Sequence, residues 1–158
     1  MRNLSFGRWE IESDPETTRR SCGAIPKSGP EECGCEPCLN FIAARSQIYS
    51  ADFLAMLAVL GISVERELEV YHMGRLTSGF HLYGGWFHFA GKILSGADAM
   101  KQVAEKSWQP DLYKATDRFS FGFTTRVQQV KKAFAGLPLV QLEFSAEVPW
   151  LIDAREPE

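Results

Sequence analysis

The cysteines constrain this chain more than any other feature of its sequence. All four lie between Cys22 and Cys38, and the rest of the 158 residues contain none. The segment from residue 21 to 38 is rich in Pro and Gly and poor in apolar side chains. An irregular segment of this length is uncommon in a compact domain unless something fixes it. We therefore expect a bound group to order this Cys-rich loop.

The spacing of the cysteines indicates a metal ion. Cys35 and Cys38 form a CxxC pair, which lets two thiolates face one ion from a tight turn, and Gly34 permits a sharp bend between Cys33 and Cys35. Cys22 must return across a longer loop to reach them. Four thiolates at about 2.3 Å are the ligand set of a structural tetrahedral zinc ion. The sequence therefore predicts a zinc site formed by Cys22, Cys33, Cys35 and Cys38.

Two alternatives to zinc remain open from the sequence. The four thiols can simply be reduced and idle. Cys35 and Cys38 can also form a redox pair, since a CxxC at a helix start lowers the pKa of a thiol. Zinc is favoured because the cysteines are clustered and the CxxC does not lie in a βαβ pattern. A shell filled by four protein ligands would be structural, with no position left for substrate.

The segment from Phe80 to Phe89 is the second informative stretch. Its centre, Gly84-Gly85, predicts a two-residue hairpin turn, because both central positions of a type I′ turn need positive φ. Such a turn would place four apolar side chains on the core face of the hairpin: Phe80, Leu82, Phe87 and Phe89. It would place the other four together on the opposite face: His81, Tyr83, Trp86 and His88.

This second face of the predicted hairpin has two interpretations. It can be a binding or catalytic surface of rings and paired histidines, which can also hold a metal ion if Glu143 of another strand joins them. It can also be a packed face whose histidines are satisfied, which is favoured because His and Trp are often partly buried without a function. An enzyme with His81 or His88 as the acid/base is an alternative function. The chain contains no phosphate-binding or nucleophile-elbow motif, which weighs against an enzyme.

The remaining patterns predict an α+β fold. Helical periodicity and caps predict helices at about 38–49 and 51–61, and alternation predicts strands at 8–12, 69–73, 119–124 and 139–147. Short helices are expected within 95–108 and 127–134. Helices grouped near the start and strands joined by short turns indicate an antiparallel sheet of five or six strands, with a helical pair on one face.

Length and charge set limits on organisation and partners. A chain of 158 residues is typical of a single domain, which we expect to span 1–158. The net charge is −3, without the dense basic patch that nucleic-acid binding requires. No apolar run is long enough for a membrane span, and no signal peptide is apparent. We expect a cytoplasmic protein with a protein or small-molecule partner, and no nucleic-acid or membrane partner.

Three segments together resemble a family of uncharacterised bacterial proteins, a domain of unknown function. They are CGCEPCLNFIAAR at 33–45, LYGGWFHF at 82–89, and VQLEF at 140–144 with Pro149-Trp150. The likeness covers most of the chain. It implies a bacterial origin, and since no activity is established for the family, it assigns no role to any residue.

Overall fold

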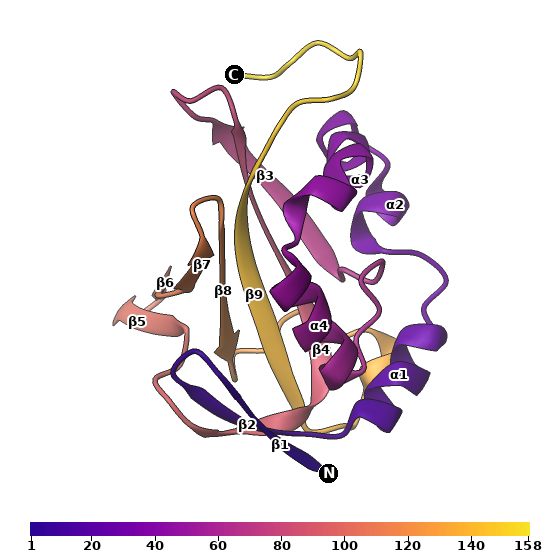
Figure 1. Cartoon of the computed structure of the whole chain (residues 1–158), viewed down its shortest axis with the longest axis vertical. Coiled ribbons are helices and arrows are strands. Elements are labelled where there is room, and N and C mark those ends of the chain that lie inside the picture. Colours follow the sequence, from indigo (N-terminus) through magenta and orange to yellow (C-terminus); the bar gives the residue numbers. More distant parts are fainter.

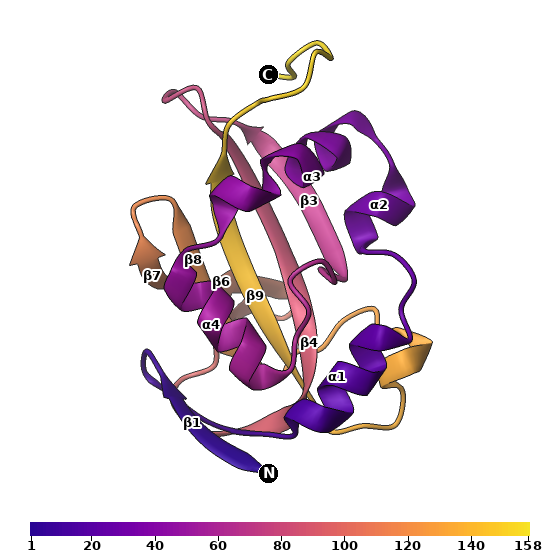
Figure 2. The same ribbon diagram turned by 45° about the vertical axis from the view of Figure 1, so that its right-hand side comes forward.

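A computed structural model describes all residues from 1 to 158 and confirms the α+β fold. Seven strands form one antiparallel sheet in the order β1-β2-β4-β9-β8-β7, with β3 also paired to β4. The sheet is therefore slightly larger than the five or six strands expected. Helices α3 and α4 lie over one face of this sheet, and α1 lies beside the edge of β4 (Figure 1; Figure 2). A separate two-stranded hairpin, β5-β6, stands apart from it.

The elements have the following bounds along the chain. The first half contains β1 (Arg2–Phe6), β2 (Trp9–Ser13), α1 (Pro15–Gly23), α2 (Gly29–Cys33), α3 (Glu36–Ile48) and α4 (Ala51–Leu60). The second half contains β3 (Glu69–Arg75), β4 (His81–Ser95), β5 (Met100–Ala104), β6 (Ser107–Pro110), β7 (Tyr113–Thr116), β8 (Phe119–Thr124), the 3-10 helix η1 (Lys132–Phe134) and β9 (Leu139–Val148).

Capping residues in the sequence mark the ends of the helices correctly. Asp14 caps α1 by accepting a hydrogen bond from the backbone N–H of Thr17, and Ser50 caps α4 in the same way through Phe53. Gly61 ends α4 with a φ of 80°, the left-handed conformation that a residue without Cβ adopts freely. The predicted helical pair is therefore confirmed as α3 and α4.

The predicted hairpin turn at Gly84-Gly85 is wrong. β4 runs through both residues without a break, and neither has a positive φ. These glycines serve close packing instead: a Cβ on Gly84 would lie 2.5 Å from the Tyr71 ring, and one on Gly85 would lie 2.5 Å from the carbonyl oxygen of Glu69. The real turn lies earlier and joins β3 to β4, with Gly79 at a φ of 92°.

Three other expectations are corrected. The segment within 95–108 forms no helix but the strands β5 and β6, and the segment within 127–134 forms only the short η1. The stretch at 21–38 is not irregular throughout. It contains the end of α1 and all of α2, which begins with a capping box between Ser28 and Glu31. Short polar helices of this kind lack the apolar periodicity on which sequence prediction depends.

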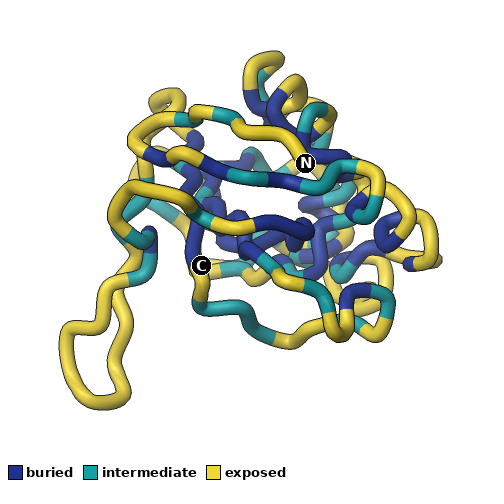
Figure 3. The backbone as a smooth tube through the Cα atoms, turned by 90° about the horizontal axis from the view of Figure 1, so that it is seen from below, coloured by how far each residue is buried: buried dark blue, intermediate teal, exposed yellow.

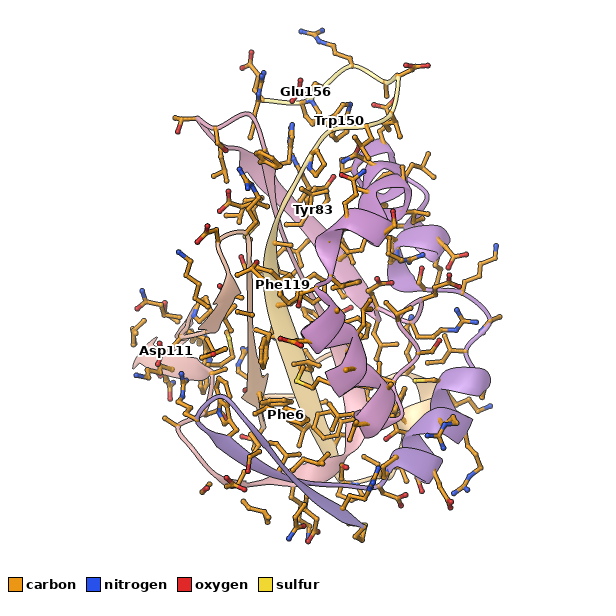
Figure 4. The ribbon with its side chains drawn as sticks, viewed as in Figure 1. Phe6, Tyr83, Asp111, Phe119, Trp150 and Glu156 are labelled. Carbon is orange, nitrogen blue, oxygen red and sulfur yellow. The ribbon has the colours of Figure 1, made fainter.

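The main core fills the space between the sheet and the helices. Alternate residues of β8 and β9 point into it, as expected, and rings from α3, α4 and β4 meet them there. Phe119 lies in this layer, and Tyr83 lies further toward the end where the chain finishes (Figure 4). The two faces of the sheet thus differ: α3 and α4 cover one, and the other is covered by η1, loops, the β5-β6 hairpin and, beside Trp86, the end of α1.

Candidate metal centre

Cys33, Cys35 and Cys38 converge at the junction of α2 and α3. Cys33 is the last residue of α2, and Gly34 turns the chain with a φ of 68°. Cys35 is the N-cap of α3, and Cys38 lies in its first turn. The three sulfur atoms all lie within 4.8 Å of one another. Three of the four predicted ligands are therefore positioned to hold a metal ion.

The geometry and the chemistry of this group suit a thiophilic ion. Zn–S bonds of about 2.3 Å in a tetrahedron place sulfur atoms about 3.8 Å apart, which the observed limit of 4.8 Å accommodates. Cys33 and Cys35 are exposed, whereas Cys38 is buried. The group is therefore half open to solvent, and an ion can enter it without any opening of the core.

The three thiols differ in their electrostatic environment. The pKa of Cys33 is lowered, chiefly because the backbone N–H of Cys35 donates to its sulfur. The pKa of Cys38 is raised strongly, first by burial and then by its hydrogen bond with Cys35. A bound cation would reverse the effect on Cys38, because metal ligation requires the thiolate and releases the proton.

Cys22 does not belong to this group. Its side chain is buried on the inner side of α1, in a small apolar cluster with Ile25, Leu68, Trp86 and Phe134. Burial raises the pKa of its thiol. Cys22 thus behaves as a small apolar core residue, and the predicted four-cysteine site is reduced to three. The reason is that α1 continues to Gly23, so its amphipathic packing fixes where Cys22 points.

The start of α3 is anchored to β4 and to the segment after β9 by Tyr83 and by Asn40, of which sequence analysis missed Asn40. The buried Asn40 amide donates to the carbonyl oxygen of Pro149 over 3.1 Å, and its Oδ1 accepts from the N–H of Leu151 over 2.7 Å. The Tyr83 hydroxyl donates to the carbonyl oxygen of Pro37 over 2.8 Å. The one sequence signal for Asn40 is that a polar residue stands next to the apolar Phe41 in the predicted helix.

The proposed binding face of His81, Tyr83, Trp86 and His88 does not exist as one surface. Because β4 is continuous, His81 and Tyr83 point to the helix-covered face, and Trp86 and His88 point to the opposite face. All four side chains are buried, with at most 6% of any residue exposed. His81 and His88 therefore lie on opposite faces of the sheet and do not form a pair.

His81 belongs to a buried chain of polar groups near the end of the sequence. Its Nδ1 lies 2.8 Å from Nε2 of His72, and its Nε2 lies 2.7 Å from a carboxylate oxygen of Glu156. Trp150 packs against the His81 ring at 5.1 Å, and Figure 4 shows Trp150 and Glu156 together at this end. The carboxylate of Glu156 has a lowered pKa because His81 donates to it. These contacts tie the C-terminal segment to the sheet.

His88 is linked through Gln141 to Glu143 on the opposite face. His88 Nε2 lies 2.8 Å from Gln141 Oε1, and the Gln141 amide donates to a Glu143 carboxylate oxygen. Burial lowers the pKa of His88 and raises the pKa of Glu143 to about 7. Glu143 thus lies on the same face as His88 but reaches it only through Gln141, and His81 points to the other face, so the carboxyl does not join the two histidines.

The buried Glu143 predicts a pH-dependent effect of Glu143→Gln. Because its folded pKa of about 7 lies above the ordinary 4.5, the folded chain binds this proton more tightly than the unfolded chain. The proton's stabilising effect is complete below pH 4.5 and is lost as pH rises to 7. The variant lacks this loss, so it should exceed the parent's stability at pH 8 by on the order of 3 kcal/mol.

Urea unfolding of the parent and the variant at pH 5 and pH 8 tests this expectation. At pH 5, where Glu143 of the folded parent is largely protonated, the two should differ by less than about 1 kcal/mol. Glu147→Gln on the same strand is the matched control. A Glu143→Gln variant with the same stability difference at both pH values would show that the carboxyl does not titrate as described.

No family model, no curated protein and no solved structure matches the chain. No helix of the structure is long and apolar enough to cross a membrane. The function of the chain is therefore inferred from the geometry of its sites.

Proposed function

We propose that this chain is a zinc-binding interaction module in which Cys33, Cys35 and Cys38 hold the ion and a group from outside the chain completes its coordination. The observation that carries the proposal is the convergence of three sulfur atoms within 4.8 Å at the start of α3. Thiolates select zinc and other soft ions over magnesium and calcium, which prefer oxygen.

With three cysteine ligands in place of the four predicted, the site need not be purely structural. Zinc sites closed by four protein ligands are structural, whereas sites with three keep one position for an exchangeable group. Cys33 and Cys35 are both exposed, so an ion held by the three thiolates would be open to solvent on their side. A thiolate, imidazole or carboxylate of a partner can therefore reach the ion. Reduced thiols are required, as in a cytoplasmic protein.

A competition titration against a chromophoric zinc chelator tests the proposal. The parent chain should bind one zinc ion, and Cys38→Ser should weaken binding by more than about 100-fold, which exceeds the usual cost of losing an outer hydrogen-bond partner. Cys22→Ala is the matched control and should bind zinc as the parent does. An equal loss of zinc affinity in Cys22→Ala and Cys38→Ser, or no zinc binding by the parent, would refute the three-cysteine site.

The asymmetry of the thiols supports a second candidate, thiol–disulfide exchange. Cys33 is exposed with a lowered pKa, while the adjacent Cys38 is buried with a raised pKa. In this role the Cys33 thiolate would attack a partner disulfide and release one partner thiolate. A second cysteine, once deprotonated, would then attack Cys33 and release the other partner thiolate, leaving an internal disulfide.

Alkylation kinetics distinguish the two candidates. If the group holds zinc, one equivalent of zinc should protect all three cysteines from iodoacetamide. If the group is a redox centre, treatment with oxidised glutathione should yield an internal disulfide with loss of two free thiols, and zinc should not be retained. Cys22 is buried and serves as the internal reference in both experiments.

A further inference from the structure

A second candidate site lies on the face of the sheet opposite α3 and α4. A cavity of about 720 Å³ opens there between β3, β4 and β9 on one side and the β5-β6 hairpin on the other. Residues 101–110 of this hairpin are all exposed, and Figure 3 shows an exposed arm projecting from the body of the molecule. The volume is within the range of small-molecule sites.

Aromatic rings form the walls of this cavity. Tyr71 and Trp86 lie side by side on the sheet with ring centroids 6.2 Å apart, and Trp108 reaches the cavity from the arm. Trp108 is 38% exposed although it is a large apolar side chain. The guanidinium of Arg126 already lies over the Trp108 ring at 4.7 Å from the centroid. The ring of Trp108 therefore already takes part in one cation–π contact within the chain, and its remaining exposed surface faces solvent.

The charged groups that line the cavity are all acidic. Glu143 lies on β9 directly opposite Trp86, with only 7% of the residue exposed, and its one hydrogen-bond donor is the Gln141 amide. Glu69 lines the same cavity from β3, and no Lys, Arg or His lines it. A carboxylate beside aromatic rings favours positive charge, and Arg126, which lies outside the lining, is the one cationic side chain near Glu143 and Trp108.

We infer that this cavity binds an organic cation, an ammonium group with apolar substituents, whose charge lies at Glu143 among the rings of Tyr71, Trp86 and Trp108. Aromatic cages with a carboxylate recognise substituted ammonium ions because the ring faces and the carboxylate both favour positive charge, while the rings also bury the apolar substituents. This inference is independent of the metal proposal, since it uses none of the cysteines.

Cation binding should be coupled to proton release from Glu143. The groups that face this carboxyl are Glu69 and Tyr71 on β3, Arg126 after β8, and His88 through Gln141. Only ionised Glu143 pairs with a cation, and the group is largely protonated below pH 7. The dissociation constant of the cation should therefore fall between pH 6 and pH 8, whereas that of a neutral ligand should not change.

Titration monitored by the indole N–H signals of the tryptophans in NMR spectra tests the inference. The probes are choline and benzyltrimethylammonium, and 3,3-dimethyl-1-butanol is the uncharged isostere of choline. We expect saturable shifts at Trp86 and Trp108 with the cations, and none at Trp9 and Trp150, which lie outside the cavity. At pH 8 choline should bind at least about tenfold more tightly than its isostere.

Two variants and one control complete the design. Glu143→Gln should abolish the preference for choline over its isostere. Trp108→Ala should weaken the binding of both cations without affecting the fold, because Trp108 lies on the exposed arm. Val103→Ala on the same arm lies outside the cavity and should behave as the parent. Equal affinity for choline and its isostere, a preference that survives Glu143→Gln, or no saturable shift with either cation would overturn the inference.

Discussion

Replacement of Arg45 by Ala should lower the free energy of unfolding by about 3–5 kcal/mol, the cost of leaving a buried charge without its partner. The Arg45 guanidinium donates to both carboxylate oxygens of Glu67, over 2.7 and 3.1 Å. Glu67 is fully buried, and its second oxygen also accepts from the Tyr49 hydroxyl over 2.8 Å. Without Arg45, the Glu67 carboxylate keeps its desolvation cost and loses its main compensation.

Urea unfolding of Arg45→Ala at pH 5 and pH 8 checks this prediction. Burial already raises the pKa of Glu67 against the effect of Arg45, so loss of Arg45 should raise it further. The variant's deficit should therefore be smaller at pH 5, where the folded chain can bind a proton at Glu67. Arg19→Ala, an exposed change on α1, is the control and should cost less than about 0.5 kcal/mol. An Arg45→Ala deficit as small as the control would contradict the account.

Replacement of Phe144 by Ala should destabilise the chain by a similar amount, about 3–5 kcal/mol. Phe144 lies on β9 at the centre of the helix-covered face and is 1% exposed. Its ring contacts those of Phe87 and Phe119, each at a centroid distance of 5.8 Å, and that of Tyr49 at 5.9 Å. Truncation would leave a cavity bounded by rings from β4, β8 and the residue that ends α3, which cannot collapse easily.

Thermal and urea unfolding measure this loss. Phe144→Leu keeps most of the buried volume and should cost less than Phe144→Ala. Leu54→Ala removes a large apolar side chain from an exposed position of α4 and is the surface control. If Phe144→Ala were no more damaging than Leu54→Ala, the ring layer between sheet and helices would not be the main source of stability.

The parts of the fold that sequence predicted are those decided by neighbouring residues. Alternation along β8 and β9, and the caps Ser50 and Gly61 of α4, depend on residues within a few positions. The hairpin at Gly84-Gly85 failed for the opposite reason. Two glycines indicate either a turn or a close approach, and the choice depends on Tyr71 and Glu69 of a strand that precedes them by more than ten residues.

The same distinction explains the candidate sites. Cys33, Cys35 and Cys38 are within six residues, so a helix end, one glycine and a helix start suffice to bring them together. Cys22 depends on the path of α1 and on its packing against Leu68, which no local pattern encodes. The cavity at Glu143 was equally hidden, because its walls come from β3, β4, β9 and the β5-β6 arm.

Zinc K-edge X-ray absorption of the zinc-loaded chain tests the central claim most directly. We expect one zinc ion with three sulfur neighbours at about 2.3 Å and one nitrogen or oxygen neighbour. The spectrum should be unchanged in Cys22→Ala. A shell of four sulfur atoms that loses one in Cys22→Ala, or a shell without sulfur, would contradict the three-cysteine centre.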